Sequence, residues 1–539
     1  MLRLLLLRFL FAVPILAFVS EVTRPQTAAT RLFSSDSCDV AVIGGGFGGL
    51  YTALAISREA QQRGKSIDVA LVEPSDSFVF LPLLYDLTVG TATEAEVCPP
   101  YAELLEGTCV RLIQASLESI DNSQSATLKP ASPKASTALS FRSAVISVGA
   151  SPESIMKSVP GALEHAQPFY TDKDAKATRR LLSRLKQQTN PPRIAIVGGG
   201  FGGVELAASV KRKIRKASVT LLSRGAPMAG TRAETLIDKA LEKLGVVVEQ
   251  CSVQAIDAVA ADDDGRSSQV TIQRTQWGDD QSRLDMDPWD AVMWTAGSRP
   301  TNPVSGGLPG LRRSDSGRLA IDSALRCFEC EDVQVQGSSS SSDGRVSTVK
   351  TVKFEQPPIW ALGDCAEIVS VNSGPAVPKT AQAAMQQAEV AAHNVLEQLD
   401  GQRSAYKKFQ YQDLGSMLTL GGPNGAVMAP RDGAFAPVFA PLLDTAGAAF
   451  ALADKMLEAT VGKPALLETL GLSLGSYGIA GAESGSAPGT LAGTLTGAAR
   501  RAVYAARMPT NRQRAVAATS AAITTAVSLA QEATEKKQG

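Results

Sequence analysis

Two glycine-rich stretches have the residue types and the spacing that could bind a dinucleotide. In the first, a short apolar run leads into Gly44, Gly46 and Gly49, and in the second into Gly198, Gly200 and Gly203. The G-x-G-x-x-G spacing allows a tight turn, a close approach of backbone to a pyrophosphate and close packing of the next helix. Both stretches contain GGGFGG. They predict two dinucleotides, most simply FAD and NAD(P)H; the alternative is two loops that only resemble each other.

The strand that follows each loop ends in a side chain that could select the nucleotide. Residues 67–72 (IDVALV) end at Glu73, whose carboxylate is placed to accept hydrogen bonds from a ribose diol; the alternative is a surface acid. The strand at 218–222 is followed by Arg224 instead of a carboxylate. Because a guanidinium pairs with phosphate oxygens in a bidentate way, Arg224 favours NADPH, or use of both donors, unless it is simply an exposed arginine.

A third stretch, residues 359–367 (IWALGDCAE), has the form of a second flavin-binding segment. A strand ends at Gly363, and Asp364 would bind the ribityl chain or a water beside the flavin. The helix that begins near Pro378 would direct its N–H groups and positive dipole at the anionic end of the flavin. Gln382 and Gln386 are four residues apart and share a face of this helix, for which an ordinary polar surface is the alternative.

Two segments leave their chemistry open. Residues 78–90 (FVFLPLLYDLTVG) lack the redox-active cysteine pair that glutathione-reductase-like enzymes carry there, so they suit apolar contact beside the flavin or core packing. Cys327 and Cys330 form a C-x-x-C that neither a second pair nor a nearby histidine supports as a zinc site, so we expect no metal. A redox dithiol remains open. The serine-rich residues 335–350 should be a flexible insertion.

Composition limits the function classes. The 539 residues allow two or three domains, and 53 basic against 53 acidic residues give no sign of nucleic-acid binding. Only two histidines exist, His165 and His393, and neither sits in a recognisable motif. A mechanism that needs a histidine base is therefore disfavoured, whereas hydride transfer through a flavin needs none.

Residues 1–35 have the composition of a targeting segment. The apolar run 9–19 is too short to span a bilayer and suits a signal-peptide core, and residues 20–35 contain arginine, serine and threonine with one acid, Glu21. The combination resembles the bipartite presequence of algae with secondary plastids. We therefore expect a plastid, with a mitochondrial presequence or secretion as alternatives.

Together these motifs resemble the type II NAD(P)H:quinone dehydrogenases, and within them the plastid branch that reduces demethylphylloquinone and plastoquinone. This resemblance implies a location at the thylakoid or plastoglobule surface. The resemblance is carried by the GGGFGG pair, FVFLPLLYDLTVGT, VPGALEHAQPFYTDKDA, MWTAGSRP, IWALGDC, TAQAAMQQA and, towards the C-terminus, FQYQDLGSMLTLG and ARRAVYAARMPTNRQR. It implies one non-covalent FAD, no proton pumping, and a pyridine nucleotide-disulfide reductase-like α/β fold with two Rossmann-like domains.

The resemblance also implies roles for single residues. FAD would be held by Gly44, Gly46, Gly49, Glu73 and Asp364. NAD(P)H would be held by Gly198, Gly200, Gly203 and Glu205, with Arg224 added from the argument above. Gln382 and Gln386 match the A-Q-x-A-x-Q motif where flavin and quinone headgroup meet. Cys365, the serine-rich insertion and the Ala/Gly-rich residues 431–489 depart from the pattern.

The predicted domain order follows from these segments. After the presequence come an FAD-binding part (36–155), the NAD(P)H-binding domain (156–300), a second FAD-binding part (301–400) and a C-terminal region (401–539). In the last, residues 491–508 and 512–535 should form helices. Their mixture of alanine with Arg500, Arg501, Arg507, Arg512 and Arg514 suits weak interfacial membrane docking, or a plain docking helix.

The sequence thus predicts a flavoprotein that binds two dinucleotides, passes a hydride from NAD(P)H to FAD and then passes two electrons to a prenylated membrane quinone. The partners that this interpretation predicts are the quinone, a membrane surface and a second copy of the chain in a homodimer. Two alternatives stay open. One is a reductase of a disulfide or iron–sulfur protein, with Cys327 and Cys330 as the working dithiol. The other is a redox-sensing flavoprotein resembling apoptosis-inducing factor.

Overall fold

The computed structural model describes most of the chain between residues 36 and 524, and the described residues from 37 onwards belong to one compact unit. The described residues are 36–120, 124–131, 138–231, 233–259, 269–277, 288–301, 303–304, 308, 310–328, 359–369, 376–421, 425–428, 490–521 and 524. The predicted presequence, the serine-rich insertion, Cys330, the 431–489 insertion and the end of the last predicted helix lie outside these residues.

The first glycine loop belongs to a sheet with the order β3-β2-β1-β6-β5-β4, in which β16 also pairs with β6. Its strands are β1 (Asp36–Ile43), β2 (Val69–Val72), β3 (Val110–Ile113), β4 (Ala115–Ile120), β5 (Ser125–Pro130), β6 (Ala138–Ile146) and β16 (Ile359–Ala361). All four residues of β2 are buried, as expected for a continuous apolar run in a parallel sheet with both faces covered. The distant segment β16 lies parallel to β6, so residues 359–361 complete the sheet that begins at residue 36.

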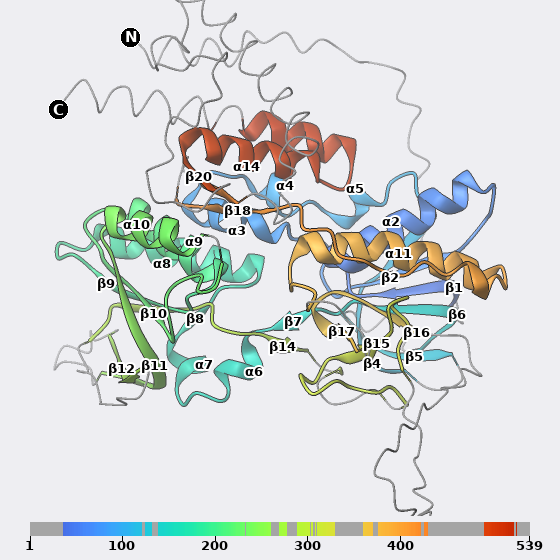
Figure 1. Cartoon of the computed structure of the whole chain (residues 1–539), viewed down its shortest axis with the longest axis horizontal. Helices are drawn as coiled ribbons and strands as arrows, with labels where there is room; N and C mark the ends of the chain where they lie inside the picture. Colours follow the sequence, from blue (N-terminus) through green and yellow to red (C-terminus); the bar gives the residue numbers. More distant parts are fainter. Residues whose placement is uncertain are drawn as a thin grey trace, which may run out of the picture. The chain divides into compact units, whose positions relative to one another are not determined.

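Two long helices pack together beside this sheet. α2 (Phe47–Gln62) follows the glycine loop, and α11 (Ala381–Leu399) lies beside α2, as Figure 1 shows. Arg63 joins the two through ion pairs with Glu59 and Glu397. The helix predicted near Pro378 is thereby confirmed, and its first turn lies close to the residues that follow β16.

The second glycine loop belongs to a six-stranded sheet with the order β12-β11-β10-β9-β13-β8. The strands are β8 (Gln167–Pro168), β9 (Arg193–Val197), β10 (Ser218–Ser223), β11 (Val246–Ala258), β12 (Val270–Gln276) and β13 (Ala291–Trp294). The helices α8 (Asp172–Gln187), α9 (Phe201–Lys213) and α10 (Glu234–Leu244) accompany it. A capping box between Thr171 and Asp174 fixes the start of α8. The two sheets confirm the predicted α/β fold with two Rossmann-like units.

Short elements connect these parts. β7 (Ala150–Ser151) pairs antiparallel with β14 (Arg299–Pro300), so the outgoing and the returning connection between the two sheets run side by side. β15 (Leu319–Ile321) pairs with β17 (Ala366–Ile368). The remaining short helices are α3 (Leu84–Val89), α4 (Glu94–Val97), α5 (Tyr101–Leu104), α6 (Glu153–Met156), α7 (Ala162–His165), η1 (Leu81–Leu83), η2 (Gly363–Cys365) and η3 (Arg403–Ala405).

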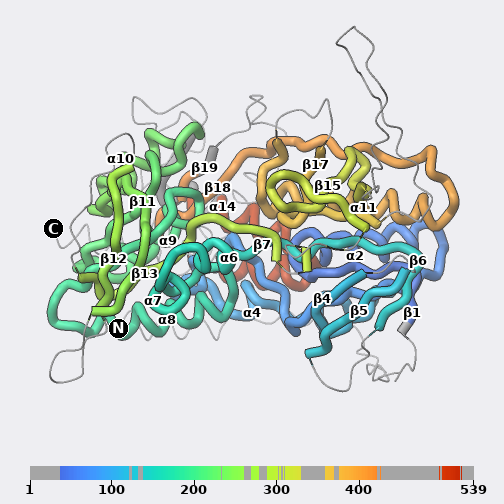
Figure 2. Tube along the Cα trace, turned by 90° about the horizontal axis from the view of Figure 1, so that it is seen from below, coloured from blue at the N-terminus to red at the C-terminus, as the bar shows by residue number. Residues whose placement is uncertain are grey.

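The C-terminal part is a small antiparallel sheet capped by a helix. It comprises β18 (Ser416–Thr419), β19 (Gly425–Met428), β20 (Thr490–Gly493) and α14 (Thr494–Ala506), which packs on this sheet (Figure 2). The predicted helix start at residue 491 is wrong by three residues, because 490–493 pair with β19 instead. Residues 511–521 are helical as predicted. Within the described residues, no helix has both the length and the hydropathy needed to cross a bilayer.

Candidate functional site

The first glycine loop is shaped so that only glycine fits at two of its positions. Gly44 has a φ of +101°, and a Cβ there would lie 2.3 Å from the Ser147 carbonyl oxygen. A Cβ on Gly49 would lie 1.7 Å from the Gly44 oxygen, which is the close helix packing predicted for it. At Gly46, by contrast, a Cβ would meet nothing within 4 Å. The loop therefore offers open backbone at the start of α2, which fits the pyrophosphate of FAD.

Glu73 lies beside this loop. The Gly45 N–H donates to Glu73 Oε2 at 2.7 Å, and the Ser75 N–H donates to Oε1 at 3.1 Å. Burial raises the pKa of the Glu73 carboxyl, and these two N–H groups oppose that shift. Sequence reasoning missed Tyr101, whose buried hydroxyl donates to the Gly45 carbonyl at 2.7 Å. The signal that could have found Tyr101 is its residue type, because a buried tyrosine usually needs a hydrogen-bond partner for its hydroxyl group.

The second glycine loop repeats the geometry of the first. Gly198 has a φ of +122°, and a Cβ on Gly203 would lie 1.6 Å from the Gly198 oxygen. At Gly200 a Cβ would meet nothing within 4 Å. The Met228 N–H donates to the Gly199 carbonyl at 2.8 Å, so the chain after β10 is tied to the loop. This cradle likewise fits a dinucleotide pyrophosphate. Arg224 is exposed where β10 ends, and its guanidinium carbon lies 5.6 Å from the centre of the Trp277 ring.

Glu205 points from α9 towards the C-terminal sheet. It is 7% exposed, and its Oε1 accepts the Thr419 N–H at 2.8 Å. Burial raises the pKa of this carboxyl to about 8, although the Arg500 guanidinium opposes the shift. Its predicted contact with NAD(P)H stays a prediction.

The second flavin segment brings Asp364 into η2, directly after β16. The Gly363 N–H donates to Oε1 of Gln387 at 2.8 Å, and Arg318 Nε donates to the Asp364 carbonyl at 3.0 Å. Burial raises the pKa of the Asp364 carboxyl, against the effect of Lys379 and Arg318. Gln387 was not singled out from the sequence. It is a buried amide on the alanine-rich face of α11, and a polar residue on such a face signals a required partner.

Gln382 and Gln386 bind the backbone of the segment that follows α11. Gln382 Nε2 donates to the Gly415 carbonyl, and its Oε1 accepts the Leu414 N–H. Gln386 donates to the Gln412 carbonyl at 2.9 Å and accepts the Gln412 N–H at 3.0 Å. Both amides therefore fix residues 412–415 beside the helix. Their predicted meeting with flavin and quinone is not tested by this geometry and stays a prediction.

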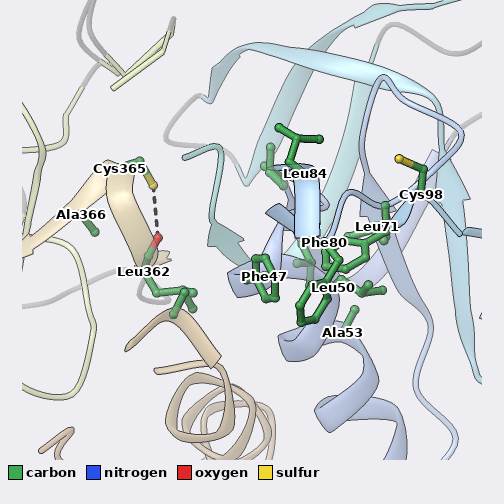
Figure 3. Close-up of a cluster of buried hydrophobic side chains, with 14 of the residues drawn as sticks. Phe47, Leu50, Ala53, Leu71, Phe80, Leu84, Cys98, Leu362, Cys365 and Ala366 are labelled. Carbon is green, nitrogen blue, oxygen red and sulfur yellow. Dashed lines mark hydrogen bonds between the residues drawn. The ribbon is translucent and has the colours of Figure 1, made fainter. Parts of the chain in front are cut away.

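The apolar segment 78–90 is largely core. Phe78 and Phe80 are almost fully buried, and their rings lie 5.2 and 5.1 Å from the ring of Phe47 on α2. Figure 3 shows Phe47, Phe80 and Leu84 in this cluster. Core packing was the alternative left open for the segment. Tyr85 differs from its neighbours, because its ring lies 5.2 Å from that of Phe169 in the second unit.

Arg500 and Arg501 correct one prediction. They were expected among the basic residues of an interfacial helix, but their side chains are only 1% and 5% exposed. Arg500 Nη2 lies 2.6 Å from Asp86 Oδ2, and Arg501 Nη2 lies 2.7 Å from Glu96 Oε1. These carboxylates of the first domain attract the arginines inward, and we call the four residues the C-terminal latch. Arg512 and Arg514 remain exposed.

Two cysteines near the flavin segment are buried. Cys365 Sγ donates to the Leu362 carbonyl at 3.3 Å, which Figure 3 marks. Cys327 is 3% exposed, and burial raises the pKa of its thiol well above the ordinary value. A protonated, buried thiol is a poor nucleophile, which speaks against Cys327 as half of a working dithiol.

Comparisons with known proteins agree with this geometry. The family profile of the pyridine nucleotide-disulphide oxidoreductases matches residues 38–338. A demethylphylloquinone reductase of Synechocystis is 31% identical over 395 residues, covering 72% of this chain and 86% of its own. The alternative NAD(P)H-ubiquinone oxidoreductase C1, chloroplastic/mitochondrial, of Arabidopsis thaliana is 27% identical, covering 72% of each chain.

Solved structures share the fold. The structure of NDH2 from Plasmodium falciparum in complex with NADH aligns with a TM-score of 0.58 at 16% identity, over 76% of this chain and 94% of that one. The reductase of a covalent putidaredoxin reductase–putidaredoxin complex aligns with a TM-score of 0.52 at 18% identity, over 73% of this chain and 81% of that one. At this identity, both show the fold alone.

Proposed function

We propose that this protein carries two electrons from NADPH through FAD to a prenylated quinone. The proposal follows from family membership: the chain belongs to the pyridine nucleotide-disulphide oxidoreductases. Its relatives place it among the type II NAD(P)H:quinone oxidoreductases. The observation that carries the proposal is the pair of glycine cradles. Each has open backbone at Gly46 or Gly200 and no room for a side chain at the two flanking glycines.

The residues of the chain bind and orient rather than react. FAD, when bound, supplies the two-electron chemistry between hydride donor and quinone. Gly44, Gly46 and Gly49 would hold its pyrophosphate, Glu73 its ribose, and Asp364 would lie near its ribityl chain. For the donor, Gly198, Gly200 and Gly203 would hold the pyrophosphate. NADPH is favoured over NADH because Arg224, and no carboxylate, follows β10.

The quinone would enter beside the start of α11. Gln382 and Gln386 hold residues 412–415 there, so we assign them to shaping the headgroup pocket through that segment. A demethylphylloquinone-like acceptor is supported by the name of the Synechocystis relative, and a ubiquinone is the acceptor in the name of the Arabidopsis relative. Plastoquinone stays a prediction from the sequence. The name of the Arabidopsis relative, chloroplastic/mitochondrial, is consistent with a plastid and with the mitochondrial alternative. We propose the plastid, with a peripheral position on a thylakoid or plastoglobule surface. A homodimer stays a prediction, which light scattering can test.

Anaerobic stopped-flow measurement tests the proposal. Flavin bleaching by NADH and by NADPH would be followed in protein without residues 1–35, and reoxidation by a short-chain plastoquinone or naphthoquinone analogue would be followed next. We expect fast bleaching, with NADPH ahead, and fast reoxidation. Fast bleaching without a quinone response would favour a protein acceptor, and a lack of bleaching with either donor would refute the dehydrogenase function.

A further inference from the structure

Trp277 is a large aromatic residue that the core does not use. Its side chain is 48% exposed, whereas the other tryptophans in the described part of the chain are at most 3% exposed. The Arg224 guanidinium lies over its ring, 5.6 Å from the centre. This distance is within the range of a cation–π contact.

Strand register places this pair at the second glycine loop. Ser223 at the end of β10 pairs with Gln250 on β11, and the Trp277 N–H donates to the Gln250 carbonyl at 3.1 Å. Trp277 therefore stands level with the carboxyl end of β10. A Cβ on Gly199 would lie 2.0 Å from Ser223 Oγ, so the loop touches the same strand end. In a Rossmann unit, the adenosine ribose of the dinucleotide lies at this end of the second strand.

The backbone beside the pair leaves open space, and Arg224 itself supplies a positive charge. A Cβ on Gly200 or on Gly225, the residue after Arg224, would meet nothing within 4 Å. Arg224 is exposed, and none of the ion pairs between described residues involves it. Stacking uses the face of a guanidinium and leaves the N–H donors at its edge available to an anion.

We propose that Trp277 and Arg224 together form the subsite for a 2′-phosphorylated adenosine, in which the Trp277 ring holds the guanidinium and the guanidinium binds the 2′-phosphate. Trp277 is thus a positioning residue that sets the preference for NADPH. The proposal rests on the function proposed above, since it assumes that the second loop binds the electron donor.

Calorimetric titration with two fragments that lack nicotinamide tests the subsite without electron transfer. The probes are 2′-phospho-ADP-ribose and ADP-ribose, added to the full-length, FAD-loaded protein. We expect the phosphorylated probe to bind about ten-fold more tightly than ADP-ribose, because guanidinium–phosphate hydrogen bonds are charge-assisted. Trp277→Ala should remove most of this ratio, Trp277→Phe should keep part of it, and Arg224→Gln should abolish it. Arg184→Gln, at an exposed arginine on α8, is the matched control and should leave the ratio unchanged.

The outcomes separate this proposal from the proposed function. The subsite would be overturned if the ratio of the two affinities stayed unchanged in Trp277→Ala, whether or not both probes bound more weakly. It would also be overturned if this ratio were near one in the wild-type protein. If the ratio behaves as expected but no quinone analogue reoxidises the flavin, the quinone reductase function fails and the subsite stands. In Trp277→Ala combined with Arg224→Gln, the ratio should fall no further than in Arg224→Gln alone, because both side chains serve one contact.

Discussion

At the scale of single residues, neighbouring side chains on one helix perform different tasks. Gln386 and Gln387 are consecutive, yet Gln386 holds the backbone of Gln412 whereas Gln387 holds that of Gly363 in the second flavin segment. The 3.6-residue period of the helix directs them to different faces. Only Gln386 was predicted from its motif.

Substituting these two glutamines should separate the half-reactions. Gln386→Ala should slow flavin reoxidation by a quinone analogue about ten-fold and leave bleaching by NADPH unchanged, because it removes only the hydrogen bonds that hold Gln412. Gln387→Ala should instead lower FAD content, since the Gly363 N–H loses its buried acceptor. Stopped-flow rates and the ratio of flavin to protein absorbance measure the two effects. Equal loss of both half-reactions in Gln386→Ala would contradict the assigned role.

Glu205 should impose a pH dependence on stability. In the unfolded chain the pKa of the Glu205 carboxyl is about 4.3, the ordinary value for glutamate. In the folded protein, burial raises this pKa to about 8. Between these values the unfolded state releases a proton that the folded state retains, so the free energy of unfolding falls as the pH rises. Glu205→Gln should remove this slope while its Oε1 can still accept the Thr419 N–H. Denaturant titrations across that pH range test this; parallel pH profiles for the two proteins would refute it.

At the scale of elements, the sequence predicted best what depends on local pattern. The strands β1, β2, β9 and β10 are apolar runs that end at glycine loops or polar residues, so their positions could be read locally. The partners of Arg500 and Arg501 could not, because the hydrogen bond from Arg500 to Asp86 spans 414 positions of sequence. Basic residues on an alanine-rich helix fit a membrane surface as well as they fit buried carboxylates. Sequence alone does not tell the two apart, because it does not show which carboxylates lie beside them.

The latch should matter for stability. Asp86→Asn would leave Arg500 buried without its charge partner, and Arg501 would lose one of two, at a cost of about 3–5 kcal/mol in the free energy of unfolding. Glu389→Gln removes the exposed pair with Arg58, whose side chains are 55% and 58% exposed, and should cost about 1 kcal/mol or less. Chemical denaturation of both variants makes the comparison. Similar losses in the two would show that the latch is not a buried ion pair in solution.

At the scale of the whole molecule, two similar units divide the binding of two nucleotides. Each unit has its own sheet, with parallel strands around its glycine loop, and the chain passes from the first unit to the second and back through the paired connections β7 and β14. This organisation was predictable from the repeated GGGFGG. The attachment of α14 to the first unit through Arg500 and Arg501 was not, because it depends on pairing between distant segments.

Damage to one loop should therefore spare the other. Gly49→Ala forces a Cβ against the Gly44 oxygen and should abolish FAD binding. Gly203→Ala forces one against the Gly198 oxygen and should weaken NADPH binding at least ten-fold while FAD content stays normal. Flavin absorbance and equilibrium titration with NADPH separate the two. Loss of FAD in Gly203→Ala would show that the units do not bind independently.

The latch also has a consequence for synthesis of the protein on the ribosome. Arg500 is translated 414 residues after Asp86, and Arg501 is translated 405 residues after Glu96. At about 5–20 residues per second, the carboxylates wait on the order of 20 to 80 seconds for their partners. During that time Asp86 and Glu96 in the nascent first domain lack their arginine partners, and the surface that α14 later covers is open to chaperones. A premature stop codon shortly before α14 would leave the domain in that state.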